Sequence, residues 1–502
     1  MRRDISYGSH LNMLGGVIRC GLALLLVARV LFVSTPAMAQ AAPPAAHEDA
    51  AFDVMNLLTQ HGLHDIHDES WNAYGQFTYI SSLKPPFSAA YTNKDFSLST
   101  EGERSFTGTL TFFVGLRLWR GGEAYFVPEV IAERPLSNLR GIGGSIQNFE
   151  LQKGGSPSPQ IYRSRTYLRQ TIGFGGKQVE KTSDPMQLAT VVDARRLVLT
   201  AGNFTILDVF DRNAITWDPR QTFFNMAFMT YASWDFPSDE RGYSWGGTAE
   251  VYWDDWALRF GRITPPQRPN QLPVDFRLDK YYGDQLELEH DHVLFGQAGA
   301  ARILGYRNNV ETGRFDDAIA AFQSDPSKSA FNAYATNCPG NYGSKSATAP
   351  DLCWVRRPNV KVGIGINLEQ HIIDDIGVFF RGMYSDGETE VDAYNPADRS
   401  VSFGALGKGS TWHRPFDVAG VAYAVSWISQ THAQYLSMGG IDGFIGDGYL
   451  RSAPESVIEA FYSVNLLEAI WLSADYQRLW NPGFNADRGP VNIFGWRVHA
   501  EF

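Results

Sequence analysis

The chain ends in the eleven residues NIFGWRVHAEF (492–502), in which large apolar side chains occupy every second position. Successive side chains of an extended strand point to opposite faces, so one face of this segment is apolar and ends in an aromatic ring. That face consists of Phe494, Trp496, Val498, Ala500 and Phe502, whereas Arg497, His499 and Glu501 lie on the other. Because the whole chain is hydrophilic, with a mean hydropathy of −0.23, the pattern predicts a strand between an apolar medium and water.

The same period of two recurs along the chain in segments of roughly ten residues, the length at which a tilted strand crosses a bilayer. In SFTGTLTFFVGLRLW (105–119), apolar residues from Phe106 to Leu118 share one face and threonines share the other. In NVKVGIGINLEQ (359–370), valines and isoleucines lie opposite Lys361 and Asn367. The chain is therefore predicted to consist mainly of strands with one apolar face.

A soluble β-sandwich also alternates, so other features must separate the two architectures. A soluble chain of 502 residues would divide into domains joined by linkers, but no Pro-, Ser- or Gly-rich linker follows residue 50. Aromatic residues also stand at predicted strand ends, as in the interfacial girdles of a membrane barrel: Trp119, Trp253, Trp256 and Trp480. The sequence therefore predicts an all-β fold, a single transmembrane antiparallel β-barrel over residues 71–502.

The number of strands follows from the turns. Bacterial barrels have an even number of strands, with short turns on the periplasmic side and long loops outside. Tight joins at 120–122, 254–255 and 372–375 are assigned to the periplasmic side together with the C-terminus. With these turns and the C-terminus on one side, residues 203–241 cannot contain a membrane strand. About 16 strands then remain, enough to enclose an aqueous channel. Residues 203–241 become the third outer loop, predicted to fold inward as a constriction.

The N-terminus has the features of a secretory signal peptide. Two arginines precede an apolar run at 21–28, and Ala37 and Ala39 give the small-x-small pattern of a cleavage site. Residues 1–39 are predicted to be the signal peptide, and residues 40–70 a periplasmic segment with a short helix. Removing the four arginines and one aspartate of the signal leaves 39 basic and 53 acidic residues, a net charge of about −14 that argues against a nucleic-acid partner.

Two cysteines remain after this cleavage, Cys338 and Cys353. They stand in a polar stretch of a predicted long outer loop, residues 309–358. In an oxidising compartment such a pair favours a local disulfide that closes the loop, and two free thiols or a metal pair are the alternatives.

Charged residues gather on the predicted inner faces of two neighbouring strands. Three arginines share one face of IYRSRTYLRQTIGF (161–174), opposite Tyr162: Arg163, Arg165 and Arg169. Glu129 and Glu133 share one face of EAYFVPEVIAE (123–133). Guanidinium groups that face carboxylates across a wet lumen supply fixed hydrogen-bond donors and acceptors. Two interpretations stay open. The charges either only keep the barrel wall hydrated, or they form a row of side chains that contacts solutes.

The predicted constriction loop interleaves polar groups with aromatic rings. The segment LDVFDRNAITWDPRQTFFN (207–225) contains Asp208, Asp211, Asn213 and Arg220 among several phenylalanines. Sugars offer hydroxyl groups at their edges and C–H groups on their faces, which suit such a surface. These four residues are candidate solute contacts, although polar residues are also typical of any turn.

Histidines supply no catalytic or metal-binding set. His61, His64 and His67 are spaced by three and could chelate a metal, but they follow an amphipathic pattern and suit a solvated helix end. The remaining histidines are scattered and form no ordered group with a serine and an acid. We expect no metal, no cofactor and no enzymatic activity, and an outer-membrane barrel enzyme is a remote alternative.

An ordered series of motifs is more specific: YFVPEV (125–130), IYRSRTYLRQTIGFGG (161–176), FDRNAITWDPRQTFFN (210–225), ERGYSWGG (240–247), IGDGYL (445–450) and NPGFNADRGPVNIFGWRVHAEF (481–502). From about residue 71 to the end, the chain resembles the carbohydrate-selective porin (OprB) family of Gram-negative bacteria. The resemblance implies an outer-membrane porin that passes monosaccharides such as glucose through a constriction lined by arginine and glutamate. The family's lumen charges match Glu129, Arg163, Arg165 and Arg169.

The sequence thus predicts an integral protein of the Gram-negative outer membrane that admits carbohydrates by diffusion. Its expected partners are carbohydrate solutes, outer-membrane lipid and the assembly machinery, which would recognise Phe502. A general diffusion porin without sugar selectivity is the main alternative. A monomer and a homotrimer are both compatible with the sequence.

Overall fold

The computed structural model describes residues 53–91, 96–216 and 218–502, and the predicted signal peptide lies outside these residues. Sixteen antiparallel strands form one closed barrel, in which each strand pairs with the barrel strands before and after it in the chain. The last strand pairs with the first. The predicted all-β class and the number of strands derived from the turns are confirmed.

The barrel strands are β1 (Trp71–Lys84), β2 (Glu103–Trp119), β3 (Gly122–Arg134), β4 (Gln160–Gly173), β7 (Arg196–Phe204), β8 (Ser244–Trp253), β9 (Trp256–Ile263), β10 (Tyr282–Leu294), β11 (Gln297–Thr312), β12 (Arg357–Ile373), β13 (Ile376–Ser385), β14 (Arg399–Lys408), β15 (Val418–Trp427), β16 (Glu455–Leu467), β17 (Ile470–Trp480) and β18 (Val491–Glu501). A separate hairpin between β4 and β7 consists of β5 (Gln178–Lys181) and β6 (Thr190–Asp193).

The helices are short: α2 (Val54–Gln60), α3 (Met226–Met229), α4 (Phe315–Ser324), α5 (Ala330–Ala335) and α6 (Gln430–Ser437). Single 3-10 turns are η1 (Leu136–Leu139), η2 (Ile206–Asp208), η3 (Leu352–Val355), η4 (Gly409–Trp412) and η5 (Pro482–Phe484). None of the helices in the described part of the chain has the length and hydrophobicity needed to cross a lipid bilayer.

The pairing of β1 with β18 joins the two ends of the chain and closes the wall. Their register runs from Gln76 opposite Glu501 to Leu83 opposite Phe494. Phe502 extends this pairing, because its N–H donates to the Gly75 carbonyl oxygen at 2.9 Å and its own carbonyl accepts from the Gly75 N–H at 2.7 Å. The Phe502 ring lies over Gly75, where any side chain would collide with it. The terminal residue therefore completes the closure.

The two faces of the strands have the predicted character. On β18, Phe494 and Trp496 are 48% and 45% exposed on the outer face, whereas Arg497 and His499 are fully buried on the inner face. Apolar residues of the other strands are likewise exposed outward, among them Phe112, Leu116, Val251, Leu258, Ile303, Val362 and Ile364. The outer surface of a membrane barrel faces lipid. Apolar side chains exposed there are therefore kept from water, as the hydrophobic effect favours.

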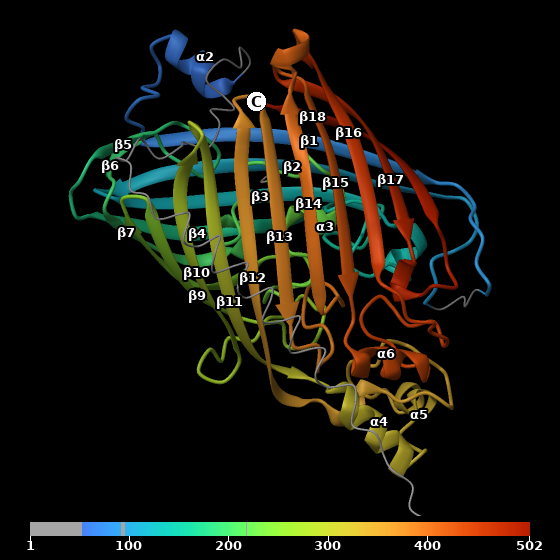
Figure 1. Cartoon of the computed structure of the whole chain (residues 1–502). Coiled ribbons are helices and arrows are strands. Elements are labelled where there is room, and N and C mark those ends of the chain that lie inside the picture. Colours follow the sequence, from blue (N-terminus) through green and yellow to red (C-terminus); the bar gives the residue numbers. More distant parts are fainter. Residues whose placement is uncertain (1–52, 92–95, 217) are drawn as a thin grey trace, which may run out of the picture. The chain divides into compact units, whose positions relative to one another are not determined.

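Connections differ in length between the two ends of the barrel. Two residues join β2 to β3, β8 to β9, β10 to β11 and β12 to β13, all at the end where α2 and the C-terminus lie (Figure 1). Short turns mark the periplasmic side of a bacterial barrel. The outer loops at the opposite end are L1 (85–91 and 96–102), L2 (135–159), L3 (205–216 and 218–243), L4 (264–281), L5 (313–356), L6 (386–398), L7 (428–454) and L8 (481–490).

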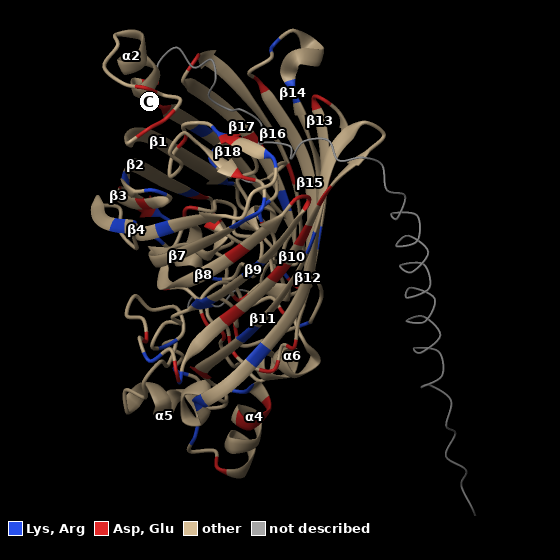
Figure 2. Cartoon of the chain, turned by 90° about the vertical axis from the view of Figure 1, so that its left-hand side faces the viewer, with Lys and Arg blue, Asp and Glu red and all other residues tan. Residues whose placement is uncertain are grey.

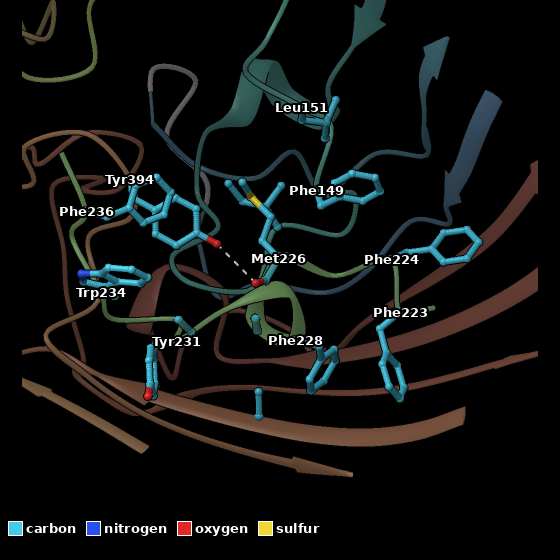
Figure 3. Packing of buried hydrophobic residues seen from close by; sticks show 14 of the residues in the cluster. Phe149, Leu151, Phe223, Phe224, Met226, Phe228, Tyr231, Trp234, Phe236 and Tyr394 are labelled. Atoms are coloured by element: carbon cyan, nitrogen blue, oxygen red, sulfur yellow. Dashed lines mark hydrogen bonds between the residues drawn. The ribbon is translucent and has the colours of Figure 1, made fainter. Parts of the chain in front are cut away.

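L3 folds into the barrel, as predicted, and builds an apolar core inside the lumen (Figure 3). The ring of Phe223 lies 5.0 Å from that of Phe461 on β16. The Tyr394 hydroxyl of L6 donates to the Met226 carbonyl oxygen at 3.3 Å. Phe149 of L2 belongs to the same buried cluster. The hydrophobic core of this protein therefore lies within the ring of strands, where L2 and L3 fill space that the wall side chains cannot reach.

Buried polar contacts fix L3 to the wall. Asp211 Oδ1 lies 3.0 Å from Arg381 Nε on β13, and both side chains are almost completely buried. The Asn213 side chain donates to the Asn367 side-chain oxygen on β12 at 2.7 Å. Removing either Asp211 or Arg381 would leave the other as an uncompensated charge in a site that excludes water. L3 is therefore a fixed part of the channel rather than a free loop.

L5, L6 and L7 form a small layer at the outer end, where α4, α5 and α6 lie together (Figure 1). Phe315 of α4 stacks on His432 of α6 with ring centroids 4.1 Å apart. His432 Nδ1 lies 3.0 Å from Asp398 Oδ2 of L6. Cys338 and Cys353 of L5 form the disulfide that the sequence favoured, with their Cα atoms 6.0 Å apart.

Deleting Phe502 should sharply lower the amount of folded barrel in the outer membrane, because both the backbone pair with Gly75 and the covering ring are lost. Phe502→Ala keeps the backbone pair and should have an intermediate effect. The amount of heat-modifiable protein on gels of outer-membrane fractions measures both. Normal amounts of the deletion variant would contradict this role.

Arg381→Met should destabilise the barrel by about 3–5 kcal/mol, because Asp211 would keep a buried charge without its partner. The double variant Asp211→Asn/Arg381→Met removes both charges and should recover much of that loss. The unfolding temperature, followed by heat modifiability, and the noise of the single-channel current measure the effect. If the double variant lost as much stability as Arg381→Met and Asp211→Asn together, the pair would not anchor L3.

Candidate functional site

Charged residues occur on the strands and on the chain segments inside the barrel (Figure 2), and two groups of those inside differ in their exposure. One group lies on β9 to β12 and is buried. Arg259 Nη1 lies 2.9 Å from Glu287 Oε1, and Arg259 Nη2 lies 2.8 Å from Glu289 Oε1. Glu287 also accepts from the Asp211 N–H at 2.8 Å, which ties this network to L3. These charges form ion pairs with one another and line the wall beneath the loop.

The second group lies on β3, β4 and the facing part of L3, and its side chains stay partly exposed. Arg165 and Asp208 are 14% and 16% exposed, and Arg169 is 25% exposed. Because these residues point into the barrel, the solvent that reaches them is lumen water. The second group is therefore the candidate site for contact with solutes.

A bulge in β4 decides which arginines reach the lumen. Val127 of β3 pairs with Arg165, but the next residue, Pro128, pairs with Arg163, so Ser164 is an extra residue in β4. Proline has no N–H group to donate to a neighbouring strand and is typical of such bulges. The Ser164 hydroxyl is buried and donates to the Val127 carbonyl oxygen at 2.9 Å.

The bulge reverses the faces of the residues that precede it. Arg163 is exposed on the outer face, and its guanidinium lies 5.0 Å from the ring centroid of Trp245. Tyr162 points inward, because its hydroxyl donates to Glu129. The predictions that Arg163 lines the lumen and that Tyr162 faces lipid are therefore wrong, since strict alternation does not hold across an extra residue.

Arg165 connects the wall to L3. Its Nε and Nη2 atoms donate to the two carboxylate oxygens of Asp208 at 2.7 and 2.8 Å, a two-pronged pair in which each group fixes the other. The guanidinium also lies 5.3 Å from the ring centroid of Tyr243, at the end of L3. The arginine thus faces a carboxylate of the loop, rather than the glutamates of β3 that the sequence suggested.

Glu129 is the centre of a second polar cluster on β3. Its carboxylate accepts from Thr111 at 2.7 Å and from Arg220 of L3 at 3.3 Å. Lys153 of L2 lies 3.9 Å away, and Tyr162 donates as well. Four other segments, β2, β4, L2 and L3, therefore meet at this one carboxylate, which holds Arg220 and Lys153 at the lumen surface.

Other predicted residues serve as anchors. Glu133 is buried and accepts from the backbone N–H groups of Lys153 and Gly155 at 3.2 and 2.6 Å, so it holds L2. Asp211 and Asn213 hold L3, as described above, and are buried. These three residues shape the lumen through the loops that they fix.

Arg169 lies farther along β4, toward the periplasmic end. Its guanidinium lies 5.1 Å from the ring centroid of Tyr125 and 5.4 Å from that of Tyr167, and the two rings are 5.1 Å apart. Glu123 lies 4.0 Å from it. Both rings are buried, so the partly exposed Arg169 guanidinium is the part of this group that can donate to a solute.

Sequence reasoning missed Lys153, Tyr162 and Tyr243 as members of the site. Pro128, in the middle of a predicted strand, is the signal that could have located the bulge and turned Tyr162 inward. Lys153 and Tyr243 belong to L2 and to the end of L3, whose paths depend on distant contacts.

Comparison with known proteins gives one family and several solved barrels. The family model described as carbohydrate-selective porin, OprB family, matches residues 114–502. The high-pH structure of Pseudomonas putida OprB superimposes with a TM-score of 0.60 at 13% identity, covering 86% of this chain and 94% of that chain. The outer membrane channel DcaP of Acinetobacter baumannii gives 0.45 at 11% identity, covering 86% and 97%. A search of curated proteins finds no match.

The structural likeness to Pseudomonas putida OprB, at this low identity, supports the fold alone. The family model spans most of the barrel, from β2 to the terminal phenylalanine. It also covers the segments that form the candidate site, namely β3, β4 and L3. The chain therefore belongs to the carbohydrate-selective porin (OprB) family and is a channel of the Gram-negative outer membrane.

Proposed function

We propose that small carbohydrates diffuse through this barrel along the partly exposed surface of β3, β4 and L3, and that Arg165, Asp208, Arg169 and Arg220 contact them. In this proposal the protein is a passive channel and catalyses no reaction. The pair of Arg165 and Asp208 is the observation that carries the proposal. In this pair the wall and the inward loop meet through side chains that are both partly exposed.

The chemistry of this surface suits a neutral sugar. Arg165 and Asp208 supply donors and acceptors that a hydroxyl group can join, and their mutual pairing keeps them in position. The ring of Tyr243 beside Arg165 is buried and helps to hold the guanidinium in place. Toward the periplasm, Arg169 supplies further donors and is partly exposed, whereas the Tyr125 and Tyr167 rings beside it are buried. A solute with several hydroxyl groups can move from one of these polar contacts to the next.

Binding along such a path must stay weak for the solute to leave. A hydrogen bond to a charged group contributes roughly 1.5–3 kcal/mol, and less in a wet pore where water competes. Two such bonds would give about −4 kcal/mol, a millimolar dissociation constant. That affinity concentrates the sugar in the lumen without trapping it.

A general diffusion porin is the alternative function. In that case the lumen charges would sort ions by their field, and a neutral sugar would lower the ion current only by displacing electrolyte. The two functions therefore differ in whether the effect of a sugar on the current saturates.

Arg165→Ala should weaken glucose block of the ion current by about tenfold, equivalent to ~1.4 kcal/mol. It should also shift the ion preference toward cations, because Asp208 loses its counter-charge. Arg165→Lys should keep the ion preference but lose part of the sugar block, since an ammonium group lacks the planar two-donor fork. Current through the purified channel in planar bilayers, titrated with glucose, measures both effects.

Arg163→Ala is the matched control, because the same residue type stands two positions earlier on the outer face of the same strand. It should leave glucose block and ion preference unchanged. Unaltered block in Arg165→Ala would show that the exposed charges only solvate the wall.

A further inference from the structure

The chain segment before β1 is attached to the inner face of the wall at the periplasmic end. Met55 of α2 is completely buried and forms a cluster with one buried residue from each of three neighbouring strands: Tyr74 of β1, Phe113 of β2 and Val127 of β3. These wall residues face inward, since their neighbours Phe112 and Phe126 are exposed on the outer face. Because α2 lies at the periplasmic rim (Figure 1), Met55 reaches into the mouth of the barrel.

The tip of the β5–β6 hairpin, residues 182–189, reaches the same inner face. The Leu188 N–H donates to the Tyr125 hydroxyl of β3 at 3.3 Å. Arg169 Nη1 of β4 donates to the Met186 carbonyl oxygen at 3.0 Å. The tip therefore begins where the proposed path of the solute reaches Arg169.

Glu69 joins the segment before β1 to the hairpin tip. This side chain is fully buried, and its carboxylate accepts from the Ala189 N–H at 2.7 Å and from the Ser183 hydroxyl at 2.5 Å. The Glu69 N–H in turn donates to the Ala189 carbonyl oxygen at 3.0 Å. His64 Nε2 lies 3.0 Å from the same carboxylate. Two segments that are 120 residues apart in sequence are thus fixed to each other.

Side chains of β1 and β2 hold both segments against the wall. The Asn72 side chain donates to the Gln187 carbonyl oxygen of the tip at 2.9 Å. Arg117 of β2 lies 2.6 Å from Asp68. We call residues 53–70 and 182–189 together the periplasmic collar.

The collar extends along five neighbouring strands of the sixteen, namely β18, β1, β2, β3 and β4. It reaches β18 at one small cavity that Asp53, Pro185 and Glu501 line together. The Glu501 carboxylate also accepts from the Gln221 side chain of L3 at 2.6 Å. The collar therefore covers a continuous part of the inner wall between Arg169 and a residue that contacts L3.

We propose that the periplasmic collar is a second constriction of the channel, in series with L3, and that solutes pass between the collar and the opposite wall as they leave. The buried seat of Met55 and the contacts of Glu69 make this a fixed restriction. The inference goes beyond the proposed function, because such a narrowing restricts solutes of any chemical class.

Two constrictions in series can be examined separately. Each adds resistance to the flow of ions, so removing one raises the conductance even when the other remains. A neutral polymer that enters from one side of the membrane meets the constriction of that side first. The size of the largest polymer that enters therefore reports on each mouth of the channel by itself.

Met55→Asp places a charge in the apolar seat and should release α2 from the wall. The single-channel conductance of the purified full barrel in planar bilayers should rise by about 1.5-fold, because the cross-section at the periplasmic mouth increases. Leu57→Asp is the matched control, since Leu57 belongs to the same helix and is 52% exposed. It should leave the conductance unchanged.

A second variant removes the hairpin tip without altering any barrel strand. The β5–β6 ladder ends with Lys181 opposite Thr190, and a two-residue Asn-Gly turn can connect antiparallel strands at such a position. Replacing residues 182–189 by Asn-Gly should raise the conductance as Met55→Asp does. Heat modifiability on gels shows that each variant barrel is folded.

Polyethylene glycols of graded size, added to one side of the bilayer at a time, locate the change. In both variants the largest polymer that enters should increase on one side of the membrane. It should stay the same on the other side, where the polymer meets the outer loops first. This asymmetry would assign the wider opening to the periplasmic mouth.

Unchanged conductance in both Met55→Asp and the Asn-Gly variant would overturn the inference. An equal increase in polymer size on both sides would also overturn it, because L3 would then have moved. Saturating block by glucose in the unaltered channel tests the proposed function and does not depend on the collar. The failure of either proposal can therefore be distinguished from the failure of the other.

Discussion

Every backbone N–H and C=O group within the bilayer must find its partner in the wall itself, because lipid offers none. The sixteen strands meet this requirement only as a closed ring, and the ring closes where β1 pairs with β18 and Phe502. Closure then dictates the faces of the strands: apolar toward lipid and polar toward the lumen. A ring of this size also leaves an interior that wall side chains alone cannot fill.

The charged residues of the interior have two roles, and whether a residue is buried or exposed distinguishes them. Beneath L3, carboxylates and guanidinium groups are dry and paired, and they hold the loop against β9 to β18. Arg165 and Arg169 of β4 and Asp208 of L3 stay partly exposed. Arg259 and Arg165 thus have the same chemistry and different consequences: one is fixed within a buried network, and the other reaches lumen water beside Asp208.

Much of the fold could be predicted because period-two patterning is local. The outward face of β18, the joins at 120–122 and 254–255, and the inward course of the third loop all follow from neighbouring residues and the even number of strands. The site could be predicted only in part. Pro128 and Ser164 create a bulge that moves Arg163 to the lipid side, and alternation cannot reveal it. Partners such as Asp208 for Arg165, or Arg220 for Glu129, depend on how loops fold back over long sequence distances.

The central claim is that a sugar binds weakly inside the lumen while it crosses. Titration of the ion current through the unaltered channel with glucose, at constant ionic strength, tests it most directly. The account predicts a decrease that saturates, with half-maximal effect at millimolar glucose. A decrease that only follows the viscosity of the solution, without saturation, would contradict it and indicate an unselective pore.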